Sequence, residues 1–162
     1  MGKDVVNLYL SLGSNLGDRK TLLNTAVARL EQRVGRLFAH SSFYETEPWG
    51  FDSDHLFLNI SVGIYTKMQP LEVLKECKNI EMEMGRSPSI RGVYEDRPID
   101  IDLLFYGDCI MEAPLLVLPH PKLHLRRFVL DPLCEIAPDF MHPVLKKTIR
   151  ELKERLLFTD KS

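Results

Sequence analysis

The stretch that reads Ile-Asp-Ile-Asp-Leu-Leu-Phe over residues 99–105 constrains the fold more than any other part of the sequence. Apolar and acidic residues alternate there, and successive side chains of a β-strand point to opposite faces of its sheet. We therefore expect a strand over residues 99–106, with one face in a core and both carboxylates on the other face. The apolar face comprises Ile99, Ile101, Leu103 and Phe105, and the acidic face comprises Asp100 and Asp102.

Periodicity and chain breakers predict three more strands and four helices. The strands are expected over 5–12, 37–44 and 57–66, and the helices over 19–34, 70–84 and 129–137 and from 149 onward. Helix starts are indicated by Asp18 as an N-cap, by Pro70 in a first turn, and by a capping box. The capping box is formed by Thr148 and Glu151. Residues 45–56 and 86–98 remain as long loops, and we expect the second to be a lid.

The resulting order of elements is β-α-β-β-α-β, followed by further helices. Two interleaved βαβ units that share one antiparallel sheet, with helices packed on it, define a ferredoxin-like α+β domain. The last helices then form a C-terminal helical extension. Because domains cluster at roughly 100–150 residues, we expect residues 1–162 to be a single domain.

Charge and cysteine content argue against several classes of protein. The 21 Lys and Arg residues against 23 Asp and Glu residues give a net charge of -2, which provides no whole-chain attraction to nucleic acid or to a membrane surface. No stretch approaches the ~18 apolar residues of a membrane span. The three cysteines contain no CxxC pair, which fits a reducing compartment. We expect a cytoplasmic monomer that acts on small molecules, without nucleic-acid or membrane partners.

Asp100 and Asp102 are the first candidates for a chemical role. Residues two apart in a strand are separated by about 6.5 Å, so two carboxylates there repel each other unless a cation neutralises them. Carboxylates combined with phosphate oxygens suit Mg²⁺ better than zinc, which prefers histidine and cysteine. On spacing alone, two solvated aspartates on the open face of a strand explain the pair equally well.

Basic residues flank this aspartate pair in the sequence. Arg86, Arg91 and Arg97 precede it, and Lys122, Arg126 and Arg127 follow it. Any one of these side chains, considered alone, fits a solvated surface position. Together with the carboxylates they form the set that phosphoryl transfer requires, since carboxylates bind the metal and guanidinium groups bind phosphate oxygens.

His120 lies between Pro119 and Pro121, which restrict the backbone and suggest that the imidazole is aimed at a ligand. A buried histidine bonded to a carbonyl is the alternative. We expect no zinc site, because Pro121 prevents a helical pairing of His120 with His124. Residues 13–21 contain two glycines but lack the adjacent Gly-Lys-Thr of a P-loop, so we interpret them as a turn followed by a helix cap.

Aromatic side chains and one carboxamide form a second candidate group. Its members are Trp49, Phe57, Asn59 and Phe128. Flat rings can stack on a planar heterocycle, and a carboxamide can both donate and accept hydrogen bonds at the edge of that heterocycle. Core packing is the alternative for each phenylalanine.

In chain order, these motifs closely resemble those of the 6-hydroxymethyl-7,8-dihydropterin pyrophosphokinases of folate biosynthesis. The matching motifs are Gly13-Ser14-Asn15-Leu16-Gly17, Ser42-Phe43-Tyr44-Glu45-Thr46 with Trp49-Gly50, Phe57-Leu58-Asn59, Gly85-Arg86, Arg97-Pro98-Ile99-Asp100-Ile101-Asp102-Leu103, and Pro119-His120-Pro121 with Arg126 and Phe128. Each motif is weak alone. The combination of Arg-x-x-Asp-x-Asp-x-Leu with a downstream Pro-His-Pro is specific.

The resemblance implies a ferredoxin-like fold and an enzyme that transfers the terminal diphosphate of ATP to the hydroxymethyl group of the pterin, leaving AMP. It implies that Asp100 and Asp102 hold two Mg²⁺ ions against the triphosphate and act in catalysis with Arg86 and Arg97. The implied phosphate contacts are Arg86, Arg97, His120 and Arg126. The implied pterin contacts are Phe57 and Phe128 as a sandwich, Asn59 at the polar edge, and Thr46 and Trp49 in the pocket wall.

Two other classes of function remain compatible with the aspartate pair: another Mg²⁺-dependent nucleotide enzyme, such as an ordinary kinase or a nucleotidyl transferase, and a non-catalytic nucleotide-binding module. An ordinary kinase releases ADP and a nucleotidyl transferase releases pyrophosphate, whereas a pyrophosphokinase releases AMP. A non-catalytic ferredoxin-like module would bind a nucleotide without turnover. Against that module, a nucleotide sensor has no need for paired metal-binding carboxylates.

Overall fold

The computed structural model describes residues 4–47, 56–85 and 98–160 of the chain. Its elements are β1 (Val6–Ser14), α1 (Arg19–Arg33), β2 (Gly35–His40), β3 (Tyr44–Thr46), β4 (Phe57–Thr66), α2 (Pro70–Glu83), β5 (Asp100–Tyr106), β6 (Met111–Glu112), β7 (Val117–Leu118), a 3-10 helix (Leu123–Leu125), α3 (Arg127–Ile136) and α4 (Ile149–Asp160). The main sheet is antiparallel in the order β2-β4-β1-β5, and β3 also pairs with β4. This is the interleaved strand order of a ferredoxin-like βαββαβ domain, so the predicted fold class is confirmed.

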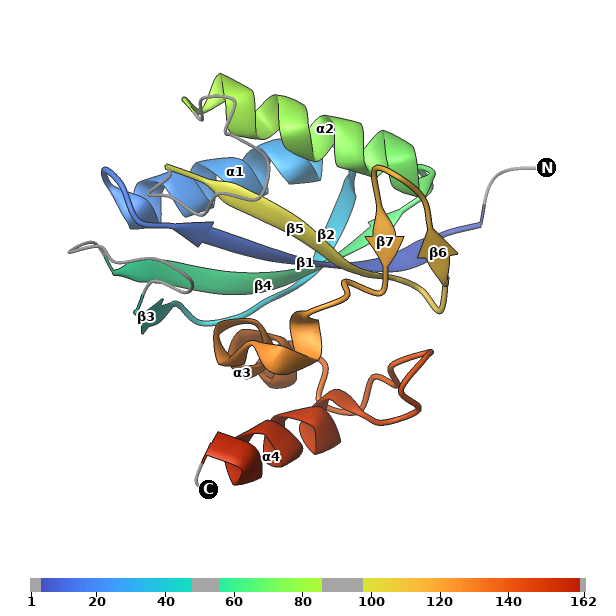
Figure 1. Cartoon of the computed structure of the whole chain (residues 1–162). Coiled ribbons are helices and arrows are strands. Elements are labelled where there is room, and N and C mark those ends of the chain that lie inside the picture. Colours follow the sequence, from blue (N-terminus) through green and yellow to red (C-terminus); the bar gives the residue numbers. More distant parts are fainter. Residues whose placement is uncertain (1–3, 48–55, 86–97, 161–162) are drawn as a thin grey trace.

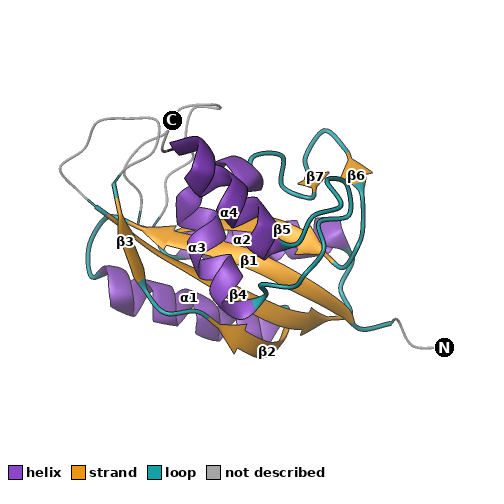
Figure 2. Ribbon diagram, turned by 90° about the horizontal axis from the view of Figure 1, so that it is seen from below, coloured by secondary structure: helices purple, strands orange, loops and turns teal. Residues whose placement is uncertain are grey.

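Helices cover both faces of the sheet. α1 and α2 lie on one face and α3 and α4 lie on the other (Figure 1), and Figure 2 shows α3 and α4 crossing the sheet. The core under α1 and α2 includes Leu10, Leu30, Ile60, Ile80 and Ile101, and the core under α3 and α4 includes Tyr9, Phe105, Leu130, Leu133 and Ile149. The C-terminal extension therefore supplies the apolar cover of one face of the sheet. None of the helices in the described ranges is long and apolar enough to cross a membrane.

Local signals predicted the starts of α1, α2 and α4 correctly. The Asp18 side chain accepts a hydrogen bond from the backbone N–H of Thr21 at 3.2 Å, as an N-cap does. At α4, the backbone N–H of Thr148 donates to Glu151, and the backbone N–H of Glu151 donates back to the Thr148 hydroxyl. Both contacts join residues close in sequence, so the chain can form them before any tertiary packing exists.

Two predicted strands had the wrong bounds, and two short strands were missed. β1 runs through Gly13 and Ser14, which were expected to break it. The strand expected over 37–44 is two strands, β2 and β3, which pair in succession along the same edge of β4. β4 has 10 residues and is long enough to hold both. The two-residue strands β6 and β7 were not predicted, because periodicity is not visible over two residues.

A β-bulge changes the predicted face of Phe105. Tyr9 pairs with Phe105, whereas the next residue, Leu10, pairs with Leu103, so Leu104 is an extra residue in β5. An extra residue reverses the in-and-out alternation beyond it. Ile101 and Leu103 therefore contact the α1–α2 core as predicted, but Phe105 lies in the α3–α4 core.

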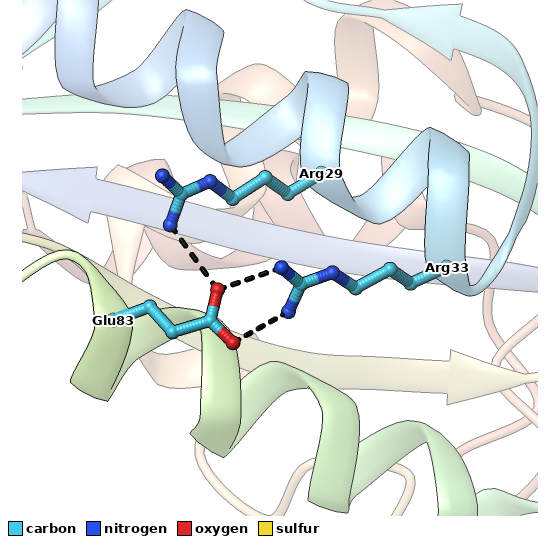
Figure 3. Close-up of polar contacts among 3 residues, drawn as sticks. All are labelled: Arg29, Arg33 and Glu83. Carbon is cyan, nitrogen blue, oxygen red and sulfur yellow. Dashed lines mark hydrogen bonds and ion pairs between the residues drawn. The ribbon is translucent and has the colours of Figure 1, made fainter.

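An ion-pair cluster joins the C-terminal parts of α1 and α2 (Figure 3). Arg33 donates to both carboxylate oxygens of Glu83 at 2.6 and 2.8 Å, and Arg29 reaches the same carboxylate at 3.3 Å. The hydrogen bonds from Arg33 lower the pKa of Glu83. These side chains are partly exposed, at 32–44%, so the cluster contributes little to stability.

A buried histidine follows α3 and is held in its neutral form. The His142 Nδ1 atom accepts hydrogen bonds from the backbone N–H groups of Val144 and Leu145 at 3.2 and 3.0 Å. His142 is 4% exposed. Burial, assisted by neighbouring His124, lowers the pKa of His142 to about 4. Protonation at Nδ1 would break both hydrogen bonds.

This arrangement predicts a loss of stability in mild acid. The unfolded histidine has a pKa of about 6.5, so between about pH 6.5 and 4 the unfolded chain binds a proton that the folded chain does not. The free energy of unfolding should therefore fall as the pH drops through this range, by up to about 1.4 kcal/mol per pH unit from this residue. Urea unfolding of the wild type and of His142→Asn, whose amide oxygen can still accept, checks this. Equal slopes against pH for both proteins would contradict it.

Candidate active site

Three strands bring two groups of predicted site residues into one row. Asp100 on β5 is in register with Gly13 on β1, and Gly13 is in register with Asn59 on β4. Adjacent strands lie about 4.8 Å apart, so Asn59 and Asp100 are about 10 Å apart across the sheet. Asp102 lies two residues further along β5, opposite Ser11. Asn59, Asp100 and Asp102 thus share the face of the sheet that carries α3 and α4.

Gly13 is the centre of this row because it has no side chain. A Cβ atom there would lie 2.8 Å from Oδ1 of Asn59 and 3.4 Å from Cδ1 of Phe57. The absence of a side chain lets the carboxamide and the aromatic ring lie over the strand. The sequence analysis assigned Gly13 to a turn, although a glycine within a strand often marks such a close approach.

The Asn59 carboxamide has a defined orientation. Asn59 is 3% exposed, and its Nδ2 donates to the Thr46 hydroxyl at 2.6 Å. Its Oδ1 lies toward Gly13. The structure therefore joins Thr46, Asn59 and Phe57. The sequence analysis had grouped Phe57 with Asn59 by residue type and had added Thr46 only by resemblance.

His120 lies beside β5 and is a neutral hydrogen-bond donor. Its backbone N–H donates to the Leu104 carbonyl at 3.0 Å, and its Nδ1 accepts from the N–H of Lys122 at 3.1 Å. With Nδ1 accepting, the ring proton is on Nε2. Burial, and then the charge of Arg126, lower the pKa of His120 to about 4, while the charge of Asp100 opposes this shift. The imidazole, the guanidinium and the carboxylate are therefore electrostatic neighbours.

Arg126 is a buried cation at the start of α3. It is 6% exposed, it is the N-cap residue of the helix, and its guanidinium carbon lies 5.7 Å from the centre of the Phe128 ring. A planar guanidinium in such surroundings binds carboxylate or phosphate oxygens strongly. α3 thus presents an anion-binding group and an aromatic ring side by side.

Glu81 is a buried residue that the sequence analysis did not identify as part of the site. It is 3% exposed on α2, and its Oε2 accepts a hydrogen bond from the backbone N–H of Ile101 at 2.7 Å. Ile101 lies between Asp100 and Asp102 on the edge strand β5. Glu81 therefore holds the backbone that carries both aspartates. The sequence did contain a signal for Glu81, because a charged residue next to Ile80 on the buried face of a helix is unusual.

Replacing Glu81 should loosen this strand. Glu81→Ala leaves the Ile101 N–H buried without its carboxylate acceptor, which costs about 1–3 kcal/mol of stability. Glu81→Gln keeps an acceptor oxygen and should cost less. Glu76→Ala, on the less buried part of α2, is the matched control. Urea unfolding checks the order of the three variants, and a Glu81→Ala protein as stable as the wild type would contradict the assignment.

Three of the predicted site residues, Trp49, Arg86 and Arg97, lie outside the described residues, as does most of the predicted lid. Their roles stay predictions. Within the described ranges, no group of three or more His, Cys, Asp or Glu side chains is arranged to hold a metal ion. The aspartate pair would thus need ligands from elsewhere to complete the coordination of a cation.

The fold and this geometry together define a ferredoxin-like αβ domain in which a carboxylate pair and a carboxamide share one face of the sheet, and in which a buried guanidinium lies beside an aromatic ring on α3. Comparison with known proteins identifies the family. Residues 9–138 match the family described as 7,8-dihydro-6-hydroxymethylpterin-pyrophosphokinase. The chain belongs to this family.

Relatives agree with this assignment, and a solved structure shares the fold. The chain is 51% identical over 138 residues to a 2-amino-4-hydroxy-6-hydroxymethyldihydropteridine pyrophosphokinase of Porphyromonas gingivalis, which covers 84% of this chain and 93% of the relative. It is 38% identical over 149 residues to the protein of the same name from Aquifex aeolicus, covering 92% and 91%. A crystal structure of wild-type Plasmodium falciparum HPPK-DHPS shares the fold, with a TM-score of 0.78 at 19% identity over 98% of this chain. This chain spans 46% of that longer chain.

Proposed function

We propose that this protein transfers the terminal diphosphate of ATP to the hydroxymethyl group of 6-hydroxymethyl-7,8-dihydropterin and releases AMP. The observation that carries the proposal is the row of Asn59, Gly13 and Asp100. This row places the Asn59 carboxamide, which can form hydrogen bonds to the edge of a heterocycle, about 10 Å from the Asp100 carboxylate, which can bind a metal ion beside the phosphates. Membership of the pyrophosphokinase family supports the same reaction.

The aspartate pair fits Mg²⁺. Two carboxylates on one face of β5 match the way Mg²⁺ is bound by one or two carboxylates and substrate phosphates. We propose that Asp100 and Asp102 hold two such ions. When bound, Mg²⁺ neutralises phosphate charge and acidifies the attacking hydroxyl.

The basic side chains bind the phosphates. Arg126 pairs its guanidinium with phosphate oxygens, and His120 donates its Nε2 proton to another oxygen. Because His120 is neutral near pH 7, it adds a hydrogen bond without adding charge. Arg86 and Arg97 are proposed to act on the same triphosphate.

The aromatic and amide side chains bind the pterin. Phe57 and Phe128 stack on its two faces, and the Asn59 carboxamide bonds to its polar edge. Thr46 orients this carboxamide and, with Trp49, lines the wall of the pocket. Stacking and edge recognition together select a flat ring with donors and acceptors on one side.

The transfer is a direct displacement. In this mechanism no covalent intermediate with the protein forms, and the pterin hydroxyl oxygen attacks the β-phosphorus itself. The new O–P bond forms as the bond from the β-phosphorus to the bridging oxygen of AMP breaks. One of the two aspartates accepts the hydroxyl proton.

Product analysis tests the proposed function. The protein is incubated with ATP, Mg²⁺ and 6-hydroxymethyl-7,8-dihydropterin, and the nucleotide products are separated by chromatography. AMP and the pterin diphosphate in equal amounts are expected. ADP would indicate an ordinary kinase, pyrophosphate would indicate a nucleotidyl transferase, and no pterin-dependent product would indicate a binding module.

A further inference from the structure

Two side chains from other elements hold the segment from Ser42 to Thr46, which includes β3. Neither side chain has a role in the proposed function as described above. β3 has only three residues and pairs with β4 alone. A strand this short gains little stability from its own ladder. Its position therefore depends on what else binds it.

Glu135 of α3 binds the first part of this segment. Its carboxylate accepts the backbone N–H of Ser42 at 3.0 and 3.1 Å, the Ser42 hydroxyl at 3.1 Å, and the Tyr44 hydroxyl at 2.6 Å. These contacts lower the pKa of Glu135, chiefly through Tyr44, and raise the pKa of Tyr44 to about 12. Hydrogen bonds to a charged acceptor are the strong kind.

Arg19, the first residue of α1, binds the other end of the segment. Its Nη2 contacts Oε2 of Glu45 at 2.7 Å, and its Nη1 donates to the Leu56 carbonyl at 2.8 Å. Glu45 precedes Thr46 and Leu56 precedes Phe57, and these two following residues are partners across β3 and β4. One rigid guanidinium fork therefore fixes the two strands at the point where both reach the site.

The segment carries the hydroxyl that orients Asn59. Tyr44 is the register partner of Asn59, and the Thr46 hydroxyl accepts the hydrogen bond from its Nδ2. Any shift of β3 would move this acceptor and release the carboxamide. α3, which carries Glu135, also presents Phe128, so the same carboxylate links β3 to the helix that carries the other proposed wall of the pocket.

We propose that Glu135 and Arg19 are positioning residues for pterin recognition. They hold residues 42–46 so that Thr46 keeps the Asn59 carboxamide in the orientation in which it can form hydrogen bonds to the polar edge of the pterin. Neither residue touches the substrate. The proposal rests on the proposed function, because it names the determinants of substrate specificity in that same site.

The test uses steady-state kinetics on Glu135→Ala and Arg19→Ala. Each variant should raise the KM for the pterin about tenfold, because small displacements of a recognition group are costly. The KM for ATP should change by less than twofold. The Kd of the pterin, measured by calorimetry with α,β-methylene-ATP present, should rise in parallel.

Conservative variants keep the proposal testable if the alanine variants fold poorly. Glu135→Gln retains an acceptor for Tyr44, and Arg19→Lys retains one of the two contacts, so both should restore part of the pterin affinity. The matched controls are Arg29→Ala and Asp139→Ala. Arg29 is an ion-paired arginine of the same helix as Arg19 (Figure 3), and Asp139 is an ion-paired acidic residue that follows α3. The control variants should keep the wild-type KM for the pterin.

The outcomes separate the two proposals. A wild-type protein that forms no AMP overturns the proposed function. A wild-type protein that forms AMP, together with variants whose pterin KM and Kd are unchanged, overturns the positioning role. An equal rise in the KM for ATP and the pterin also overturns it, because that result indicates a general structural role.

Discussion

Asp100→Ala and Asp102→Ala are each expected to lower turnover by about 10³-fold or more while leaving the fold intact. Each change removes a proposed metal ligand, and both carboxylates lie on the face of β5 opposite Ile101 and Leu103, which pack in the core. AMP release is measured beside the thermal melt. Binding of Mn²⁺ with an unreactive ATP analogue provides a readout independent of turnover.

Asp108→Ala is the matched control for these variants. Asp108 is exposed beyond the other end of β5, so its removal should change neither turnover nor Mn²⁺ binding. Chelation of the metal in the wild type should reproduce the loss seen with the aspartate variants. Retention of most of the turnover in either variant would show that the metal assignment is wrong.

Asn59→Ala is expected to lower kcat/KM for the pterin by about 10²-fold, because the site loses the group that bonds to the polar edge of the ring. The KM for ATP should stay within twofold of the wild type. Steady-state kinetics with each substrate varied in turn measures both values. The carboxamide lies about 10 Å from Asp100, so the binding of ATP near the aspartates should not be affected.

Thr46→Val provides a graded comparison. It removes the acceptor of the Asn59 hydrogen bond but preserves the volume of the side chain, so the carboxamide remains and loses its fixed orientation. We expect a smaller loss of pterin kcat/KM than for Asn59→Ala. If Asn59→Ala lowered kcat/KM equally for ATP and for the pterin, the division of the site into a pterin side and a phosphate side would be contradicted.

Elements with local causes were predicted well. The N-cap at Asp18 and the capping box at Thr148 connect residues three apart, and β4 was predicted with its observed bounds of Phe57–Thr66. In each case the signal and the structure lie within a few residues of each other. Sequence patterns report such interactions directly.

Features that depend on a partner strand were not predictable in this way. The division into β2 and β3 and the extension of β1 follow from how each strand pairs, and the bulge at Leu104 follows from its register with Tyr9. Register is a property of two strands at once, and a shift of one residue exchanges the faces. Alternation within one strand therefore could not place Phe105.

The sequence by itself determined which side chains are proposed to carry the chemistry of the site. The alternating aspartates, the arginines around them and the Pro-His-Pro turn gave the donor groups, and the motifs in chain order gave the family, which comparison confirms for residues 9–138. The tertiary structure alone decided how these groups meet. Gly13, Glu81, Arg19 and Glu135 act on residues far away in the chain, as in the hydrogen bonds from Ser42 and Tyr44 to Glu135. No local pattern can indicate such contacts, because they exist only once the sheet and its two helical layers have brought the strands together.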